Sequence, residues 1–252
     1  MFVALMAPNP KATVSQLVTQ KHNATDFGLT LLMIPTLNEE EAIGGLLSEA
    51  HTVGFADTLV VDGFSSDSTR EFAERAGANV VLQDFGKGKG CGVRTGMRIF
   101  LEGKKELLCV IDGDGTNAPS SLAGLVPLAA SGRADVVLGS RTRGPREKGS
   151  MGWLTLASNL TVSLLLGAKF GGLFTDIQTG YWVFTRSAIE RIYPRIESTG
   201  FEIELELFVK SLKEGLRVRE VPAEFRRRRG FTKFSFMLRM RNLYYALRFL
   251  VS

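Results

Sequence analysis

Two aspartates separated by one glycine follow an apolar stretch near the middle of the chain. Asp112, Gly113 and Asp114 come directly after residues 107–111, which have the length and composition of a buried strand. In an extended segment, residues two apart project to the same side, so both carboxylates can face one cation. Mg²⁺ or Mn²⁺ takes one or two carboxylates and completes its shell with phosphate and water oxygens. The pair therefore predicts a metal site facing a diphosphate, which Gly113 allows to approach the backbone.

The chain is poorly supplied for most other catalytic chemistries. His22 and His51 are its only histidines, and Cys91 and Cys109 are its only cysteines. A histidine-built metal centre, a Ser–His triad, a zinc site or a disulfide framework would each lack parts. The expected metal is therefore held by carboxylates and ligand oxygens, and the cysteines are expected to be reduced thiols, as in the cytosol.

Polar turns follow two other predicted strands. Asp62 follows residues 58–61, and its carboxylate can accept hydrogen bonds from a base or a ribose. Residues 65–68, which follow it, are interpreted as turn and cap residues. A second turn, residues 35–39, ends the first strand; Asn38 is expected to cap the next helix, and Glu39 to reach a ribose.

Two basic segments are candidates for contact with phosphate. Glycines alternate with lysines over residues 86–90, but the spacing matches neither the P-loop nor the dinucleotide fingerprint. A flexible loop that opens a helix explains this segment as well; Lys89 and Arg94 are its candidate phosphate ligands. Residues 226–229 are four arginines, whose guanidinium groups bind phosphate in a fork. The alternatives for this run are a solvated basic loop and nucleic-acid binding, which the absence of a recognition motif disfavours.

Short apolar stretches alternate with helical patterns along the chain, which predicts an α/β fold with a doubly wound, mainly parallel sheet. The expected strands are residues 29–34, 58–61, 80–83, 107–111 and 135–139, and the expected helices are residues 38–50, 68–76, 91–101, 149–169 and 201–213. Ligands on such sheets bind beyond the carboxyl ends of the strands. The three acidic turns all lie there.

Residues 149–168 form a 20-residue stretch without charge, between Lys148 and Lys169. Its polar residues recur at helical spacing, opposite a row of large apolar residues. The polar stripe is Thr155, Ser158, Asn159 and Ser163; the apolar row is Trp153, Leu154, Leu156, Leu160 and Leu164. We therefore expect an amphipathic helix that lies on the core or at a membrane interface, rather than a span.

The net charge of +5 is distributed unevenly. Residues 217–252 hold ten Lys and Arg but only two Glu, whereas the remainder of the chain is slightly acidic. Such a basic end favours phosphate ligands or an anionic membrane surface over a merely solvated helix. The expected organisation is a leader over residues 1–27, a catalytic domain over 28–230 and a basic amphipathic C-terminal tail over 231–252.

Together these features resemble one family. Residues 35–39 are similar to the opening motif of family 2 glycosyltransferases, residues 62–68 to their nucleoside-binding turn, and residues 112–114 to their metal motif. Residues 139–141, 175–180, 201–204 and 227–233 follow in the order seen in dolichyl-phosphate mannose and glucose synthases. The resemblance covers roughly residues 29–233 and implies a GT-A type fold.

The resemblance also implies roles for individual residues. It assigns the nucleoside to Pro35, Leu37, Glu39 and Asp62, and the metal, Mg²⁺ or Mn²⁺, to Asp112 and Asp114. It assigns donor diphosphate or acceptor phosphate to Arg141, Arg227 and Lys233, and the sugar and acceptor pocket to Asp176 and Gln178, with Glu202 or Glu204 near the sugar. Asp114, Asp176, Gln178 and Arg141 are the residues expected to act in catalysis.

The reaction implied is inverting transfer of a hexose from a GDP-mannose or UDP-glucose type donor to a polyprenyl (dolichyl) phosphate. An acceptor phosphate is already ionised, so it needs positioning more than deprotonation, and no enzyme nucleophile is required. The expected location is cytoplasmic and peripheral on the cytoplasmic membrane face, without a nucleic-acid partner; the oligomeric state is open. The alternatives are the same fold with a small soluble acceptor such as a glycerate, and a non-enzymatic membrane or nucleic-acid binding module, which would leave the three acidic turns unexplained.

Overall fold

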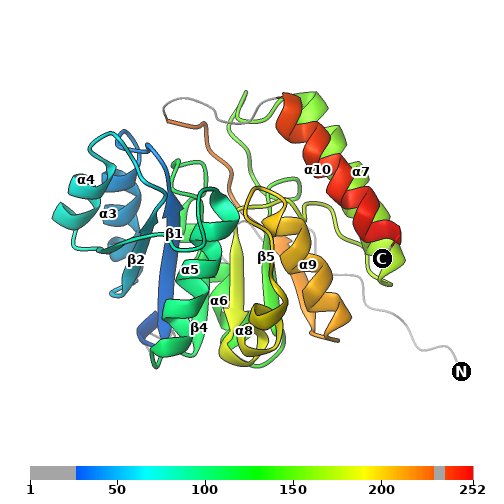
Figure 1. The fold of residues 1–252 in the computed structure, drawn as a ribbon, viewed down its shortest axis with the longest axis horizontal. Helices are drawn as coiled ribbons and strands as arrows, with labels where there is room; N and C mark the ends of the chain where they lie inside the picture. The colour runs from blue at the N-terminus through cyan, green and yellow to red at the C-terminus, as the bar shows by residue number, and fades with distance from the viewer. Residues whose placement is uncertain (1–26, 230–235, 252) are drawn as a thin grey trace, which may run out of the picture.

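The computed structural model describes residues 27–229 and 236–251 of the protein. A seven-stranded sheet with helices on both faces makes up most of it (Figure 1). Residues 1–26 of the predicted leader lie outside the described residues, as does Lys233. Phe27, the last residue of that leader, is buried and packs edge-on against the ring of Phe55.

The sheet is mainly parallel, as predicted. Its strands are β1 (Thr30–Thr36), β2 (Thr58–Asp62), β3 (Asn79–Leu82), β4 (Leu107–Val110), β5 (Val136–Ser140), β6 (Trp182–Thr185) and β7 (Val218–Pro222). They lie in the order β3-β2-β1-β4-β6-β5-β7. Only β6 runs antiparallel to its neighbours, β4 and β5. The five predicted strands are present with small shifts at their ends, whereas β6 and β7 were not predicted.

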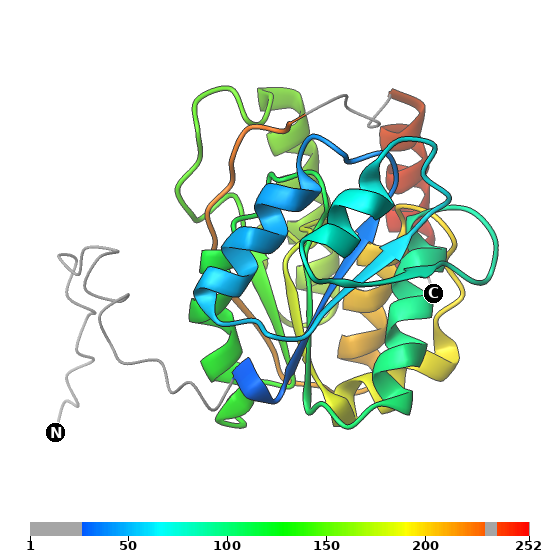
Figure 2. The same ribbon diagram turned by 90° about the vertical axis from the view of Figure 1, so that its left-hand side faces the viewer.

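Both faces of the sheet are covered, which explains why its central strands are apolar without alternation. In β1, Leu32 and Ile34 pack into the core beneath one face, and Met33 packs into the core beneath the other. Helices α3 (Ile43–Val53), α4 (Thr69–Arg75) and α6 (Leu122–Ala130) cover the first face. Helices α5 (Lys89–Glu102), α8 (Arg186–Ile192) and α9 (Ile203–Lys213) cover the second, and Figure 2 shows α6 and α5 on opposite sides of the sheet.

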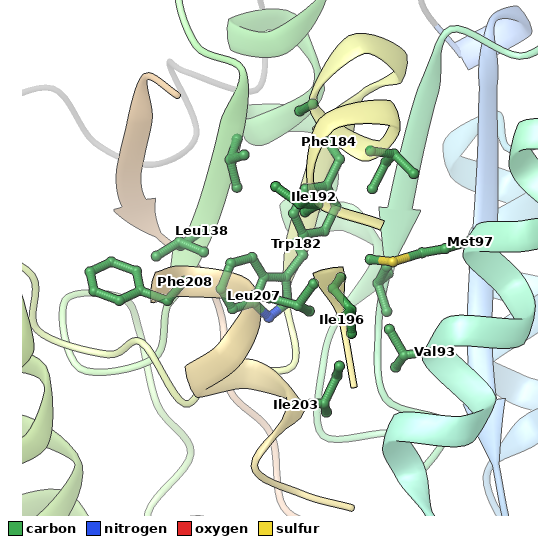
Figure 3. Packing of buried hydrophobic residues seen from close by; sticks show 14 of the residues in the cluster. Val93, Met97, Leu138, Trp182, Phe184, Ile192, Ile196, Ile203, Leu207 and Phe208 are labelled. Carbon is green, nitrogen blue, oxygen red and sulfur yellow. The ribbon is translucent and has the colours of Figure 1, made fainter. Parts of the chain in front are cut away.

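The core of the second face is built around the short strand β6. Trp182 lies at its centre, with Met97 of α5 on one side and Phe208 of α9 on the other (Figure 3). The rings of Trp182 and Phe184 are stacked with their centroids 5.5 Å apart. Because β6 runs against its neighbours, the chain that precedes it, residues 175–181, arrives at the carboxyl ends of β4 and β5. This reversed strand thus brings a distant loop to the ligand-binding edge.

Two long helices lie side by side away from the sheet (Figure 1). They are α7 (Trp153–Lys169) and α10 (Phe236–Val251), and α10 also packs against α9. No helix in the described part of the chain is both long and apolar enough to cross a bilayer.

The predicted amphipathic helix is present, but it begins at Trp153 rather than at residue 149. Only part of the predicted polar stripe is buried: Asn159 and Ser163 are inside together with the apolar Val162 and Leu166, whereas Trp153 is 75% exposed and Leu154 is 55% exposed. Ser158, expected in the polar stripe, is exposed. The helix therefore buries a mixed polar and apolar face against the protein, and most of its predicted apolar row lies on the outside.

Candidate active site

The two aspartates of the predicted metal motif lie where β4 ends, and each is paired with a cation from elsewhere in the chain. Asp112 Oδ1 is 2.6 Å from Lys89 Nζ. Asp114 Oδ2 accepts a 2.6 Å hydrogen bond from Arg228 Nη1, and its Oδ1 accepts from the Thr116 hydroxyl at 2.6 Å. The carboxylate pair thus already attracts positive charge. Gly113 between them is needed because a side chain there would meet Thr36 Cγ2 at 2.6 Å.

Lys89 occupies a buried position between two carboxylates. Its ammonium group lies 2.6 Å from Asp112 Oδ1 and 2.5 Å from Glu204 Oε1. Burial alone would lower the pKa of Lys89, but the two carboxylates outweigh it and hold the pKa above its ordinary value. Burial raises the pKa of Glu204, partly offset by Lys89.

The glycine-rich segment opens a helix, as one of the two interpretations of its sequence expected. Helix α5 begins at Lys89, and its Cys91 N–H donates to the Thr199 carbonyl at 3.3 Å. A Cβ at Gly88 or Gly90 would overlap the backbone carbonyls of Thr199 or Ser198. The glycines therefore allow the helix start to pack against residues 198–200, which directs Lys89 into the site.

The turn after β2 holds a buried carboxylate with one oxygen left over. Asp62 is fully buried, and its Oδ2 accepts from the Ser65 N–H at 2.9 Å. Its Oδ1 accepts no hydrogen bond from any residue that the structure describes. Because a buried acceptor without a partner costs free energy, this oxygen is suited to an N–H or O–H of a bound ligand. Leu37, 40% exposed, lies beside Gly63 next to it, and Pro35 is half-buried at the end of β1.

The turn after β1 is joined to this second turn. Asn38 adopts a φ of 51° and its Oδ1 accepts from the Ser66 N–H at 2.8 Å. The prediction that Asn38 caps a helix was wrong, because α3 begins only at Ile43 and the amide is used to link the two turns. Glu39 is buried; its N–H donates to the Thr69 hydroxyl at 2.7 Å, and its Oε1 accepts from Arg228 at 2.6 Å.

The four consecutive arginines alternate between inside and outside, as expected for an extended segment. Arg228 points inward and joins Asp114 to Glu39. Arg227 points outward: it is exposed, and its Nε donates to the Lys148 carbonyl at 2.7 Å. Arg228 is therefore the member of the run whose side chain pairs with the metal motif, and the phosphate contact expected of Arg227 stays a prediction.

A second buried network lies at the ends of β5 and of the loop before β6. Arg141 donates to both carboxylate oxygens of Asp176, from Nε and Nη2, at 2.7 Å each, and from Nη2 to the Gln178 carbonyl at 2.6 Å. Burial would lower the pKa of Arg141, but the Asp176 carboxylate outweighs it and raises the pKa. Glu220 of β7 fixes the loop by accepting from the Asp176 N–H at 2.8 Å. The structure thus brings Arg141, Asp176 and Gln178 together, and the roles expected of them in binding phosphate and sugar stay predictions.

The two networks meet at Gly180. A side chain at this position would overlap Asp112 Oδ2 and Asn117 Nδ2, so only glycine lets the 175–180 loop lie against the metal motif. Of the two glutamates expected near the sugar, Glu204 contacts Lys89 in the site. Glu202 instead accepts from the Gly200 N–H at 2.9 Å and pairs with Arg241, so it holds the turn before α9.

This arrangement fits a cation bound by two hard oxygen donors. Among the described residues, no group of three His, Cys, Asp or Glu side chains surrounds a common point. A cation between Asp112 and Asp114 would therefore complete its shell with oxygens of a ligand and of water, which suits Mg²⁺ or Mn²⁺.

Comparison with known proteins identifies the family. The sequence model of glycosyl transferase family 2 matches residues 32–193, more than half of the chain. This chain belongs to glycosyl transferase family 2. The glycosyltransferase has the GT-A type doubly wound, mainly parallel sheet with flanking helices that the sequence predicted.

Several proteins resemble this glycosyltransferase. Glycosyltransferase AglJ of Haloferax volcanii is 36% identical over 194 residues, which cover 77% of this chain and 62% of AglJ. The chain thus spans about three fifths of that relative. The undecaprenyl-phosphate mannosyltransferase of Micrococcus luteus is 31% identical, over 81% of this chain and 87% of that protein. The fold is shared with glucosyl-3-phosphoglycerate synthase from Mycobacterium tuberculosis, in complex with Mn²⁺, UDP-glucose and phosphoglyceric acid (TM-score 0.72, 17% identity, 97% of this chain and 86% of that one).

Three site residues of the glycosyltransferase were not singled out from the sequence. Arg228 was predicted only as part of a basic run, although the period-two alternation of an extended segment carries the signal that separates it from Arg227. Glu220 lies on the unpredicted strand β7. Asn117 lies in the turn after the metal motif, and its buried Nδ2 has no hydrogen-bond partner among the described residues.

Proposed function

We propose that this glycosyltransferase moves a hexose from a nucleotide sugar of the GDP-mannose or UDP-glucose type to a polyprenyl phosphate, with inversion, using Mg²⁺ or Mn²⁺. The observation that carries the proposal is the position of the aspartate pair. Asp112 lies between the turn that buries Asp62 and the Arg141–Asp176 network. The loop of that network contacts Asp112 at Gly180. Side by side along one edge of the sheet there are thus a hydrogen-bond acceptor for a base, two metal ligands and a phosphate-binding region.

The donor is proposed to lie along the ends of β2, β1 and β4. Asp62 Oδ1 is the acceptor for a polar hydrogen of the nucleoside, with Pro35, Leu37 and Glu39 around it. Asp112 and Asp114 would hold the metal ion, which supplies charge neutralisation for the departing diphosphate. The related fold of the Mycobacterium tuberculosis synthase, which was crystallised with Mn²⁺ and UDP, supports this placement.

The chain's own residues are proposed to position the two reactants. An oxygen of the acceptor phosphate forms a bond to the anomeric carbon as the bond to the diphosphate oxygen breaks, so a single displacement inverts the configuration. Lys89 and Glu204 lie beside Asp112, where the sugar would be. Arg141, Asp176 and Gln178 line the side from which the acceptor arrives, and Arg227 and Lys233 are proposed to attract its phosphate from outside.

The names of relatives support a lipid phosphate as the acceptor. They include, besides the Micrococcus luteus mannosyltransferase, a polyprenol monophosphomannose synthase of Mycolicibacterium smegmatis (28% identical) and a dolichyl-phosphate hexose transferase of Haloferax volcanii (31% identical). These three proteins match about four fifths of this chain each.

A peripheral position on the cytoplasmic face of the membrane is proposed from the outer surface of α7 and α10. Neither helix contains Asp or Glu, and Lys169 and Arg248 lie in their last turns. The large side chains exposed there and in the following loop are Trp153, Leu154, Leu160, Leu164, Leu165, Leu173, Leu243, Tyr244 and Leu247. Apolar surface together with positive charge is the combination that anionic bilayers bind.

A donor and acceptor screen tests the proposal. We expect a polyprenyl-phosphate hexose from one nucleotide sugar in the presence of Mn²⁺ or Mg²⁺, with inverted configuration, and a higher melting temperature with the matching nucleoside diphosphate and metal. Transfer only to a glycerate would instead establish the soluble-acceptor alternative. Neither turnover nor a shift in melting temperature with any nucleotide would contradict a nucleotide-sugar enzyme.

A further inference from the structure

The buried polar stripe of α7 contacts the loop that carries Asp176 and Gln178. Asn159 is only 5% exposed, and a buried amide requires hydrogen-bond partners. The Asn159 amide finds hydrogen-bond partners for both its nitrogen and its oxygen in one of its two possible orientations. There, Nδ2 donates to the Thr155 carbonyl at 3.3 Å and to Gln178 Oε1 at 3.2 Å, and Oδ1 accepts from Arg141 Nη2 at 3.1 Å.

The contact between Asn159 and Gln178 determines the orientation of the Gln178 amide. Because Oε1 accepts from Asn159, Nε2 is the end turned away from α7. The backbone carbonyl of Gln178 is held separately by Arg141. Gln178 is half-buried, so part of its side chain is open to solvent.

Helix α7 holds the neighbouring residue as well. Ser163, one turn after Asn159, donates its hydroxyl to the Asn159 carbonyl at 2.6 Å and accepts from the Ile177 N–H at 3.0 Å. Residues four apart lie on the same face of a helix. Two consecutive residues of the loop, Ile177 and Gln178, are thus attached to one face of α7.

We propose that Asn159 is a positioning residue for the acceptor phosphate. It fixes the Gln178 amide so that Nε2 donates to a phosphate oxygen, while its own Oδ1 accepts from the Arg141 guanidinium. This role rests on the proposed function. Asn159 acts through Gln178 and does not contact the substrate. If Asn159 served packing alone, its substitution would lower the stability of the protein and would not change the acceptor KM more than the donor KM.

Variants of Asn159 separate these two roles. In Asn159→Asp the side chain keeps its shape and its acceptor for Arg141 but has no N–H for Gln178. We expect the KM for polyprenyl phosphate to rise about tenfold, the effect of losing one hydrogen bond of about 1.4 kcal/mol, with the donor KM within about twofold of wild type. Asn159→Ala removes both contacts. It is likewise expected to raise the acceptor KM more than the donor KM. Ser158→Ala, on the exposed side of the same helix, is the control and should change neither KM.

A double-mutant cycle measures whether Asn159 and Gln178 act together, and a loss of protein stability in the variants does not change this comparison. Because Asn159→Asp keeps the acceptor for Arg141, adding Asn159→Asp to Gln178→Ala should not raise the acceptor KM further if Asn159 acts through Gln178. Additive losses, equal changes in both KM values, or an unchanged acceptor KM in Asn159→Asp would each overturn the inference. Wild-type protein that transfers to no lipid phosphate would overturn the proposed function and this inference together, whereas active wild type with unselective variants would overturn the inference alone.

Discussion

The carboxylates of Asp112 and Asp114 are each neutralised by a residue from a different part of the chain. Lys89 comes from the start of α5, and Arg228 from the segment after β7. Such pairing stabilises a half-buried acidic pair before a ligand arrives, because like charges close together repel. Metal and diphosphate would then add to a site whose charge is already balanced.

Replacing either aspartate by asparagine should nearly abolish transfer while preserving the fold. In Asp112→Asn or Asp114→Asn the metal loses a charged ligand, and we expect the rate to fall by about 100-fold or more. Steady-state turnover and the melting temperature are the measurements. Asp84→Asn is the control, because Asp84 is half exposed and pairs with Arg98 on the surface. Near-wild-type turnover in both site variants would contradict the metal assignment.

Neighbouring arginines of the basic run should differ in their effect on stability. Arg228→Ala leaves the carboxylates of Glu39 and Asp114 without a partner that they share, and we expect the free energy of unfolding to drop by about 2 kcal/mol. Arg227→Ala removes an exposed side chain and should change it by less than about 0.5 kcal/mol. Urea unfolding compares the two. If both substitutions lowered the free energy of unfolding equally, the inward position of Arg228 would contribute nothing to stability.

At the scale of elements, the sequence predicted the N-terminal half of the sheet well because its strands are apolar runs separated by clear helices. Strand β6 was missed since it is only four residues long and is followed at once by α8. Strand β7 was missed because it lies at the edge of the sheet and two consecutive residues in it, Arg219 and Glu220, are charged, which removes the apolar signal. Its Glu220, which fixes the Asp176 loop, could not be found without it.

The orientation of α7 illustrates a different limit. The separation of polar and apolar faces was readable from spacing, but spacing does not state which face the protein covers. A polar stripe usually faces water. Here Asn159 and Ser163 are buried because they satisfy the loop before β6, whose position depends on a strand that sequence patterns did not reveal. Pairing between distant segments decided the outcome.

Two helical glycines should respond oppositely to alanine. In α5, a methyl group at Gly90 would overlap the Ser198 carbonyl, so Gly90→Ala should destabilise the protein by about 2 kcal/mol and raise the donor KM through Lys89. In α6, Gly124 has open space around it, and Gly124→Ala should stabilise by about 0.5 kcal/mol because alanine favours helix. Chemical denaturation and donor kinetics measure both. A harmless Gly90→Ala would contradict the close packing of α5 on residues 198–200.

At the scale of the whole molecule, apolar surface and charge are segregated. The acidic groups that bind cations lie at the carboxyl edge of the sheet, whereas α7 and α10 offer leucines without any acidic side chain. The same helix α7 carries Asn159 on its inner face. The predicted division into a catalytic domain and a tail stays a prediction, although α10 packs against both α7 and α9.

Binding to anionic vesicles should depend on the outer face of α7. Leu165 and Leu82 are both 48% exposed, but Leu165 lies on α7 and Leu82 on the edge strand β3. We expect wild type to co-sediment with vesicles of phosphatidylcholine and phosphatidylglycerol at low salt and to dissociate in about 0.5 M NaCl. Leu165→Glu should weaken binding, and Leu82→Glu should not.

Two results would count against this surface. Wild type that stays in the supernatant at low salt would remove the membrane from the proposal and favour a soluble acceptor. Equal weakening by Leu165→Glu and Leu82→Glu would indicate a general effect of added negative charge rather than contact through α7.

The pairing of Arg228 with Glu39 spans 189 residues, and its pairing with Asp114 spans 114. A ribosome adds about 5–20 residues per second, so on the order of ten seconds separate the synthesis of Asp114 from that of Arg228. During that interval the nascent N-terminal half carries both carboxylates without their guanidinium partner. A chain whose synthesis stops before Arg228 would therefore lack the guanidinium group that joins Glu39 to Asp114.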